Sequence, residues 1–576
     1  MALLIDAIII FAYFACIVVI GLRLGRRDES LRDFALGGRR VPWWAVMASI
    51  IAAETSAATY LGTPGEGYAM RSLAYAQIVI GLILGRVLVG YFFLKPYYDY
   101  KVYTVYDYLG IRFGPMSKNY VSALFLFMRT LASGTRLFVP SLVMVLAWGL
   151  FASASGRGTG AQWSSSVTPY VVAIVALTIL TCLYTAVGGI KAVIWTDVVQ
   201  AGLMFGTALL AIVTLLYHVG GDSWNFVSDG LPAVARHVPE MTRSQGYFVF
   251  GWEDALVDKW KATNHLAQMT PWEWTKLTLA SPYTLFSAIL ANAAMNIAAF
   301  GTDQDMVQRL LTAETYKKSR RSLITAAVMD LPIYATFTFI GVLLIAYYAQ
   351  KPEFKPTSNA DVFASYIFNV LPTGIRGLVL AGVFATAMGS LSAALNALAT
   401  SATNDWYIPY FARGRDERHH VAVARWFTAV FALLMILVAS IFAYAKVRNP
   451  DVRIIPVVLG IASFILGPML GVFLLGMFTR KRGSDIGNII AITAGLLATI
   501  VLGHLHVELA NLATAPGRFA APAWLPKIAF TWFALIGAAV VVLVGVLFRT
   551  PDHVLAAAAR KRDEAHDDQR PVALRG

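Results

Sequence analysis

Long apolar runs recur along the whole chain, and their length restricts the fold more than any other feature. A helix rises about 1.5 Å per residue, so roughly 20 apolar residues cross the hydrocarbon layer of a bilayer. About thirteen segments are close to this length. With ends good to about three residues, they are roughly 3–22, 42–68, 73–95, 119–151, 169–187, 191–219, 279–300, 322–349, 374–404, 421–445, 454–479, 485–505 and 525–548.

The composition agrees with a membrane protein. Hydrophobic residues make up 58% of the chain and charged residues 14%, whereas a soluble domain has about 45–50% apolar and roughly 25% charged residues. A soluble core cannot bury this excess of apolar side chains. We therefore predict an all-α polytopic membrane protein with about 13 transmembrane helices.

Basic residues gather in alternate short loops, which predicts the orientation. The chain has 47 Lys and Arg against 33 Asp and Glu, a net charge of +14. In a soluble protein this excess would suggest nucleic acid, but in a membrane protein it follows from the positive-inside rule. The first loop carries Arg23, Arg26, Arg27, Arg32, Arg39 and Arg40. We expect a multi-pass protein of the cell (inner) membrane, with its N-terminus outside, its C-terminus in the cytoplasm and no nucleic-acid partner.

The order of the segments predicts one membrane domain with two appendages. Residues 1–549 form the transmembrane domain, 220–278 an external loop or cap, and 550–576 a charged cytoplasmic tail. Cys16 and Cys182 both lie in apolar runs, so neither a disulfide nor a zinc framework is expected. The polar groups in the spans form no nucleophile–base pair, so the chain is not predicted to be an enzyme. A membrane sensor is less favoured because no regulatory domain follows the spans.

Six ionisable residues fall inside predicted spans, where an unpaired charge is costly and marks a functional candidate. They are Glu54, Arg86, Arg129, Arg136, Asp197 and Asp330. Internal ion pairs are the favoured interpretation for Arg86 and Arg129. Arg136 has two candidate partners: an internal acid such as Glu54 or Asp330, or a carboxylate on the transported solute. A guanidinium grips a carboxylate through two hydrogen bonds, which favours a carboxylate-bearing solute.

Polar and small residues interrupt the second and ninth predicted helices at matching depth. Ala52–Ser56 and Thr386–Ser390 both reach the middle of the bilayer at about 1.5 Å per residue. A broken helix would free backbone carbonyls, and hydroxyl and carbonyl oxygens suit an alkali cation. We predict a cation site between these helices. Ser56 and Thr59 on the same polar segment are candidates for contact with the solute.

Four blocks of residues, in order along the chain, resemble the sodium:solute symporter family. The first is Asp33-Phe34-Ala35-Leu36-Gly37-Gly38-Arg39 followed by Pro42-Trp43-Trp44-Ala45, and the second runs from Tyr184-Thr185-Ala186-Val187-Gly188-Gly189 to Trp195-Thr196-Asp197. The third is Gly301-Thr302-Asp303-Gln304 with Val307-Gln308-Arg309, and the fourth is Leu395-Asn396-Ala397-Leu398-Ala399-Thr400.

The resemblance implies a leucine-transporter-type fold with a five-plus-five inverted repeat. The repeats would cover about 42–219 and 279–479, with the first helix peripheral and two extra helices within 485–548. Such a protein is a secondary active transporter that couples sodium entry to uptake of a small organic solute by alternating access. Na+ is its coupling ion, the lipid bilayer its surroundings, and we expect a monomer.

The resemblance also implies ligands for sodium. The main site would use backbone carbonyls of Ala52, Thr55 and Thr386 with the side-chain positions Gly389 and Ser390. A second sodium site would involve Asp197 and Ser392. Many relatives have two adjacent hydroxyls where this chain has Gly389-Ser390, so one ligand oxygen is missing. Ala393 lacks a hydroxyl that would strengthen the second site.

The solute positions depart from the sugar-transporting branch of the family. Ala299 stands where those members place a gating tyrosine, although Asn296 fits their pattern. Asp330 replaces their lysine and Glu54 their asparagine. Together with Arg136, these charges favour an organic anion or a zwitterion over a neutral sugar. A sodium/sugar cotransporter and a proton-coupled symporter, with Glu54 or Asp330 as the proton carrier, remain the alternatives.

Overall fold

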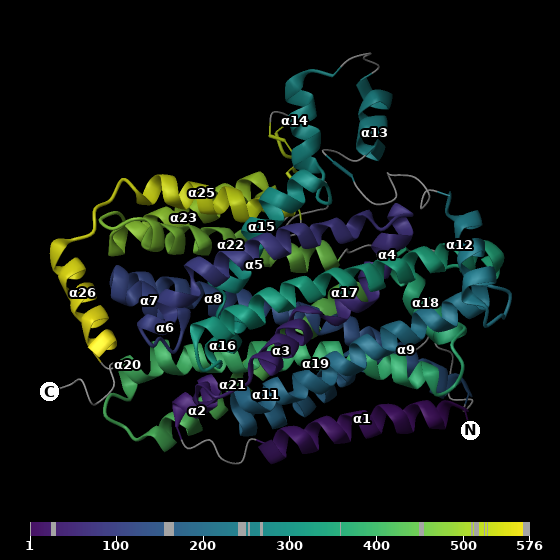
Figure 1. The fold of residues 1–576 in the computed structure, drawn as a ribbon, viewed down its shortest axis with the longest axis horizontal. Helices are drawn as coiled ribbons and strands as arrows, with labels where there is room; N and C mark the ends of the chain where they lie inside the picture. The colour runs from purple at the N-terminus through teal and green to yellow at the C-terminus, as the bar shows by residue number, and fades with distance from the viewer. Residues whose placement is uncertain are drawn as a thin grey trace.

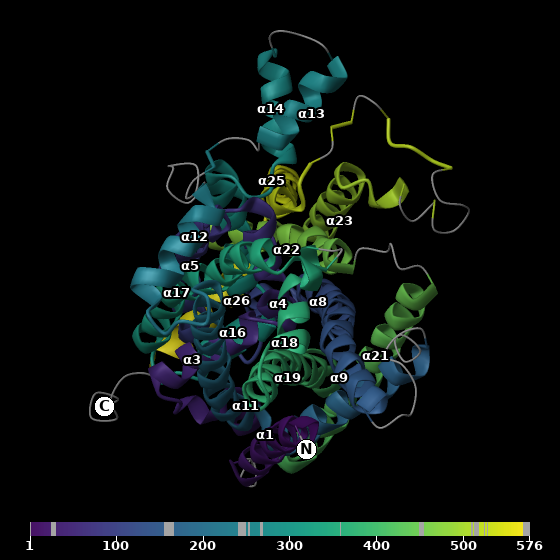
Figure 2. The same cartoon turned by 90° about the vertical axis from the view of Figure 1, so that its right-hand side faces the viewer.

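The computed structural model describes residues 2–567, except for 25–29, 155–165, 240–248, 251–253, 265–268, 357–358, 449–453, 508–510, 512–517, 523–524 and 527. The described residues form helices and two isolated β-bridges, and no strand occurs among them. Most of the helices lie side by side along the long axis of the molecule (Figure 1), and Figure 2 looks along this bundle. The described part of the chain is therefore an all-helical bundle, as predicted.

The helices of the first half, up to the predicted external loop, are α1 (Ala2–Leu24), α2 (Leu31–Leu36), α3 (Trp43–Glu54), α4 (Ala57–Met70), α5 (Val79–Phe92), α6 (Leu94–Asp99), α7 (Val105–Arg112), α8 (Pro115–Arg136), α9 (Phe138–Ala154) and α11 (Val167–Val219). After that loop come α15 (Ala293–Gly301), α16 (Gln304–Leu311), α17 (Tyr316–Gln350), α18 (Val362–Asn369), α19 (Ile375–Ser401), α20 (Ile408–Phe411), α21 (Glu417–Arg448), α22 (Ile454–Phe478), α23 (Asp485–Leu502), α25 (Phe533–Gly545) and α26 (Asp552–Asp567). Three π-helical turns, η3 (Phe226–Gly230), η6 (Ser287–Asn292) and η9 (Ala402–Tyr407), lie between them.

The structure differs from the predicted helices at the second helix and at the fifth and sixth, and each difference has a local cause. The second predicted helix is broken between α3 and α4, where Thr55 is extended and the Ser56 hydroxyl caps α4 by accepting a hydrogen bond from the Thr59 amide (3.4 Å). The fifth and sixth predicted helices form one run, α11, bent where Gly189 has φ 51° and ψ −155°. Glycine adopts this left-handed backbone without the steric cost of a Cβ.

The segment between the seventh and eighth predicted spans is not the exposed loop that we expected. It contains α16, and every residue of α16 is buried. The buried face includes Arg309, whose charge the sequence alone would place in solvent. The physical reason is that Asp305 of α16 itself and Asp197 of α11 supply carboxylates for this charge. A short polar helix can then be buried because its charges are paired.

The length and composition of the helices support a membrane protein. In the described part of the chain, eight helical runs are long and apolar enough to cross a bilayer, and the run over α11 has 53 residues. Shorter apolar helices cover Trp43–Glu54, Ser287–Gly301, Ala462–Phe478 and Phe530–Gly545. The count of about 13 crossings stays a prediction.

The predicted external loop contains three described helices, α12 (Leu231–His237), α13 (Asp254–Asn264) and α14 (Pro271–Ala280). Helices α13 and α14 stand out from the bundle in both views (Figures 1 and 2). Within the predicted loop, residues 240–248, 251–253 and 265–268 lie outside the described residues. The predicted tail begins with α26, and residues 568–576 lie outside the described part.

Two glycines allow α5 to approach the segment around α15 closely. A Cβ on Gly81 would lie 1.9 Å from the backbone oxygen of Ala288, and a Cβ on Gly85 would lie 2.7 Å from that of Ala293. These distances are shorter than any van der Waals contact. The four-residue spacing of the glycines puts both on one face of α5, as small residues in membrane helices require for close packing.

We expect Gly81→Ala to destabilise the protein by about 1–3 kcal/mol, because the added methyl group forces two backbones apart. The measurement is the melting temperature of purified protein in detergent. Gly202→Ala in α11 is the matched control, since no atom lies within 4 Å of its added Cβ. The control should be neutral or stabilising, as alanine favours helices by up to about 1 kcal/mol over glycine. Equal melting temperatures for the two variants would contradict the close packing.

Candidate functional site

A small cavity lies beside the break between α3 and α4. Its walls come from the start of α4, the end of α8, the start of α9 and the middle of α19. The lining residues are Ser56, Ala57, Ser133, Arg136, Leu137, Pro140, Ala387, Ser390 and Leu391. The structure thus brings together three residues that were predicted separately: Ser56 and Arg136 for the solute, and Ser390 for sodium.

The broken end of α3 approaches α19 at Gly389. Helix α3 ends at Glu54, so the amide of residue 56, which an unbroken helix would direct to the Ala52 carbonyl, lies outside the helix. A Cβ on Gly389 would lie 3.2 Å from this carbonyl oxygen. Thr55, the next predicted ligand, is buried at the break and its amide bonds to the Ile51 carbonyl (3.1 Å). A backbone carbonyl near a facing helix is the kind of oxygen that alkali cations bind.

Three residues of the predicted sodium sites on α19 carry hydroxyl groups: Ser390 and Ser392, and also Thr386, whose backbone carbonyl is the predicted ligand. Each donates its proton to the carbonyl oxygen three residues earlier: Thr386 to Val383 (2.7 Å), Ser390 to Ala387 (3.1 Å) and Ser392 to Gly389 (3.1 Å). The lone pairs of the hydroxyl oxygens therefore remain able to face a cation. Their role as sodium ligands stays a prediction.

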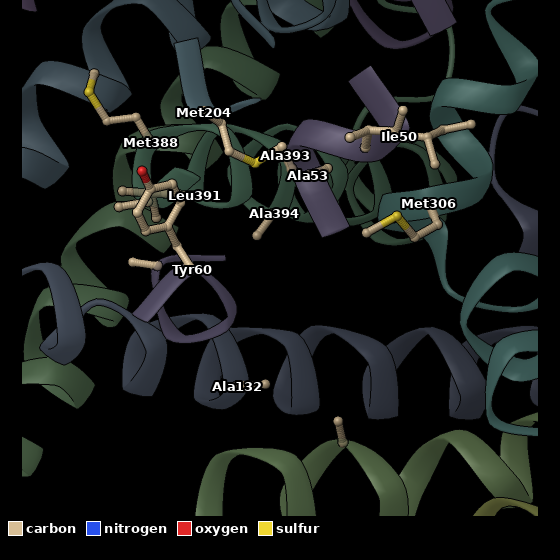
Figure 3. Close-up of a cluster of buried hydrophobic side chains, with 14 of the residues drawn as sticks. Ile50, Ala53, Tyr60, Ala132, Met204, Met306, Met388, Leu391, Ala393 and Ala394 are labelled. Atoms are coloured by element: carbon tan, nitrogen blue, oxygen red, sulfur yellow. The ribbon is translucent and has the colours of Figure 1, made fainter. Parts of the chain in front are cut away.

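Apolar side chains on the same helices as the predicted ligands are buried. Ile50 and Ala53 of α3, Met204 of α11, and Met388 and Ala393 of α19 belong to one buried cluster, which Figure 3 shows in close-up. Tyr60 enters the same cluster from α4, and its hydroxyl pairs with that of Thr207 (2.9 Å). A dry surrounding of this kind strengthens the attraction between an ion and its few oxygen ligands.

Asp197, the acid of the predicted second sodium site, lies next to the first. It is fully buried on α11, and its Oδ2 accepts hydrogen bonds from Ser49 (2.6 Å) and Arg309 (3.4 Å). Its Oδ1 lies 3.5 Å from the position of a Gly389 Cβ. Residues of both predicted sodium sites, the Ala52 carbonyl and Asp197, therefore lie beside Gly389.

Arg309 belongs to the third family block, and the structure places it in the middle of a buried network of ion pairs. Its Nη1 contacts Asp305 (2.8 Å), and its other nitrogens reach Ser49 and Asp197. Asp305 also pairs with Arg129, which in turn lies 3.3 Å from Asp303. Asp197 is the sequence feature that could have indicated Arg309. A carboxylate inside a predicted span needs a cationic partner, and Arg309 lies between two predicted spans.

Arg136 lines the cavity without a direct ion pair. Its guanidinium makes no hydrogen bond or ion pair within the described residues, and it is only partly exposed. The internal partners considered for it, Glu54 and Asp330, are both engaged by Arg86 instead. Asp303 and Asp305 lie close enough to attract Arg136 electrostatically, and a carboxylate of the solute as its direct partner stays a prediction.

Arg86 forms a buried triad with the two acids. Its Nη1 lies 2.8 Å from Asp330, its Nη2 bonds to Glu54, and its guanidinium lies 4.0 Å from the centre of the Phe300 ring. The prediction of internal ion pairs for Arg86 and Arg129 is confirmed. Neither Glu54 nor Asp330 lines the cavity of Arg136, so their predicted contact with the solute stays a prediction.

The remaining solute candidates lie at two different places. Thr59 is in the first turn of α4, with its hydroxyl 3.4 Å from that of Ser56, which lines the cavity. Asn296 lies on the face of α15 that packs against Gly85 of α5, and its side chain donates to the carbonyl of Asn292 (2.9 Å). The structure brings Thr59 close to the cavity and leaves Asn296 outside its lining.

Comparisons with known proteins point to one family. A family model described as "Sodium:solute symporter family" matches residues 34–495. The chain is 28% identical over 531 residues to the sodium/sialic acid symporter SiaT of Proteus mirabilis, covering 88% of this chain and 94% of that one. It is 25% identical over 530 residues to the sodium/glucose cotransporter of Vibrio parahaemolyticus, covering 88% and 86%.

The fold is also shared with a solved structure. A Na+-coupled sialic acid symporter in a substrate-bound, outward-open state superposes with a TM-score of 0.71 at 24% identity. The match covers 94% of this chain and 97% of that structure. The likeness confirms the predicted leucine-transporter-type helical fold.

Proposed function

Because the chain belongs to the sodium:solute symporter family, we propose that its solute carries a carboxylate and that Arg136 binds it. The protein is a sodium-coupled symporter, a transporter and not an enzyme. The observation that carries the proposal is the guanidinium of Arg136, which lines the cavity without a direct ion pair among the described residues. Burying a guanidinium costs free energy unless an anion pairs with it. A carboxylate can accept two parallel hydrogen bonds from its planar N–H groups.

The start of α4 provides a second attraction for an anion. Helix α4 has 14 residues, and its N-cap Ser56 and first residue Ala57 line the same cavity as Arg136. The amide groups at a helix N-terminus carry a partial positive charge equivalent to about half a unit, and they bind anions. A carboxylate in the cavity would lie between this helix end and the guanidinium. The solute class is therefore an organic anion or a zwitterion, and a sialic acid, the solute named for SiaT, is such an acid.

The sodium ligands proposed from the sequence adjoin this cavity. Ser390 lines it, and Gly389, its neighbour, faces the Ala52 carbonyl. Sodium held by Ala52, Thr55, Thr386 and Ser390 would fix α3 against α19 and so shape the wall of the solute cavity. Binding of either partner then raises the affinity for the other by the same factor, which is the linkage that symport by alternating access requires.

The inverted-repeat architecture is proposed from the resemblance to the sodium:solute symporter family. Repeats over about 42–219 and 279–479 would each begin with an interrupted helix, α3–α4 in the first and η6–α15–α16 in the second. The basic first loop supports an N-terminus outside and a C-terminus in the cytoplasm of a cell-membrane protein. That the protein acts as a monomer stays our expectation.

A panel of solutes tests the solute class. Purified protein is heated with organic anions, zwitterions and neutral sugars, each with sodium or with potassium at equal ionic strength. A ligand that binds the folded protein raises the melting temperature. We expect a carboxylate-bearing solute to give the largest shift and to need sodium. A neutral sugar that stabilises the protein as strongly would refute the proposed class.

Ser390→Ala tests the main sodium site. Removing one oxygen ligand should raise the sodium concentration for half-maximal uptake by about tenfold, the scale of one contact to a charge. Expression should be unchanged, since the hydroxyl only bonds within its own helix. The measurement is solute uptake in proteoliposomes against sodium concentration. Uptake that does not depend on sodium but depends on a pH gradient would contradict both the proposed site and sodium as the coupling ion.

A further inference from the structure

Two buried oxygen atoms on α11 face the cation region without a hydrogen-bond donor. Asp197 and Gln200 are 0% and 1% exposed. Ser49 and Arg309 occupy one carboxylate oxygen of Asp197, and Gln200 donates its amide to the Tyr13 hydroxyl (3.2 Å). Within the described residues, Asp197 Oδ1 and Gln200 Oε1 accept no hydrogen bond. A buried acceptor without a donor is costly and calls for a partner.

Both oxygens point to one place, beside Gly389. The position of a Cβ on Gly389 lies 3.0 Å from Gln200 Oε1, 3.2 Å from the Ala52 carbonyl oxygen and 3.5 Å from Asp197 Oδ1. Three acceptors from α3 and α11 thus converge where α19 has no side chain. Acceptors crowded together repel one another unless a positive charge lies among them.

The oxygens at this place suit a cation. The ion-paired network that includes Asp197 has three carboxylates, on Asp197, Asp303 and Asp305, and two guanidiniums, on Arg129 and Arg309. Arg136 lies close enough to Asp303 and Asp305 to add a third positive charge to their surroundings without a direct ion pair. The oxygens are hard ligands of carboxylate, carboxamide and carbonyl type, the set that suits a sodium ion rather than a soft metal.

We propose that the side-chain oxygen of Gln200 is a sodium ligand, acting with Asp197 in the second cation site. This inference rests on the proposed sodium sites and adds a residue to them. Gln200 adds an oxygen to this site, and the absence of a side chain at Gly389 is what makes room for it. A serine at 389 would place its Cβ 3.0 Å from Gln200 Oε1 and 3.2 Å from the Ala52 carbonyl, tighter than ordinary contact.

The test compares substitutions on both sides of this contact. Gln200→Leu removes the oxygen with little change in volume, and we expect it to raise the sodium concentration for half-maximal thermal stabilisation by about tenfold or more. Gly389→Ser should also weaken the sodium response, because the serine crowds Gln200. In Gln200→Ala/Gly389→Ser the serine hydroxyl has room, so the sodium response should recover beyond that of Gln200→Ala alone or Gly389→Ser alone.

The readout is the melting temperature of the purified full-length protein as sodium replaces potassium at constant ionic strength. Thr178→Val, about six turns earlier on α11, controls for general damage to that helix, since among the described residues the Thr178 hydroxyl bonds only to the Ile174 carbonyl of the same helix (2.7 Å). Gln200→Glu, which keeps the shape, is the second probe and should tighten sodium binding by adding charge. It remains informative if Gln200→Leu does not fold.

The outcomes separate this inference from the proposed sodium sites. An unchanged sodium response in Gln200→Leu, or additive effects in the double variant, overturns the role of Gln200 while the main site tested by Ser390→Ala stands. A loss of sodium binding in Gln200→Glu also overturns it, because the amide nitrogen would then be the group that faces Asp197. A wild-type protein that sodium does not stabilise overturns both.

Discussion

Arg136→Lys is expected to weaken binding of a carboxylate solute by at least about tenfold, or 1.4 kcal/mol, while the solute-free protein melts at nearly the same temperature. Lysine keeps the charge but loses the planar fork that holds a carboxylate through two hydrogen bonds. The solute-free fold should tolerate the change because Arg136 has no ion pair or hydrogen bond to lose among the described residues.

The measurement is the thermal shift produced by the solute at saturating sodium, for wild type and variant. Arg425→Lys is the control: this arginine is also partly buried, but it contacts the carbonyl of Val187 (3.4 Å) and lies on α21, outside the cavity lining. Its solute response should match that of wild type. If a neutral solute stabilises wild type and Arg136→Lys equally, Arg136 is a structural residue and the carboxylate proposal fails.

Arg86→Met is expected to have the largest effect on stability, a loss of about 3–5 kcal/mol, the usual result of removing one partner from a buried ion pair. The substitution leaves the carboxylates of Glu54 and Asp330 close together without their shared cation. The protein should be recovered in low yield and melt well below wild type. Neutralising both acids in the same background, with Glu54→Gln and Asp330→Asn, should restore much of the loss.

Asp330→Asn alone distinguishes a structural triad from a transport role. Arg86 then keeps Glu54 as its partner, so the melting temperature should stay near that of wild type. Sodium-driven uptake should also persist, since Asp330 lies outside the cavity lining. A stable Asp330→Asn variant that no longer transports would show that Asp330 acts on the solute or on a proton.

The fold class could be predicted because it depends on a property that each segment carries by itself. A run of about 20 apolar residues is helical in a bilayer whatever its neighbours are, since only a helix satisfies its own backbone there. The break at Thr55–Ser56 was also visible, because small and polar residues interrupt the apolar run and Ser56 is a good helix cap.

The cavity residues could be predicted one by one but not as a set. Ser56, Arg136 and Ser390 stood out as polar groups in apolar helices, and the structure places all three around one cavity. Their shared location depends on how α4, α8 and α19 cross. Packing between helices far apart in the chain decides this, and no local pattern reports it.

The pairing of charges is where sequence reasoning failed. Glu54 and Asp330 were considered as partners of Arg136, yet both pair with Arg86. Arg309 was placed in a loop, yet it is buried among Ser49, Asp197 and Asp305. An ion pair depends on distances of a few ångströms between helices, whereas the sequence shows only that a charge lies within a span.

The amino-acid sequence by itself determined that this protein is a helical membrane symporter, because apolar length and family motifs are local properties of the chain. Only the tertiary structure decided which charges neutralise one another and which are left for ligands. Arg86 and Arg129 have internal carboxylates, whereas Arg136 faces the cavity and Gln200 and Asp197 turn free oxygens toward Gly389. The physical reason is that a buried charge is stable only beside an opposite charge. For Arg86 and Arg129 that opposite charge lies on another helix.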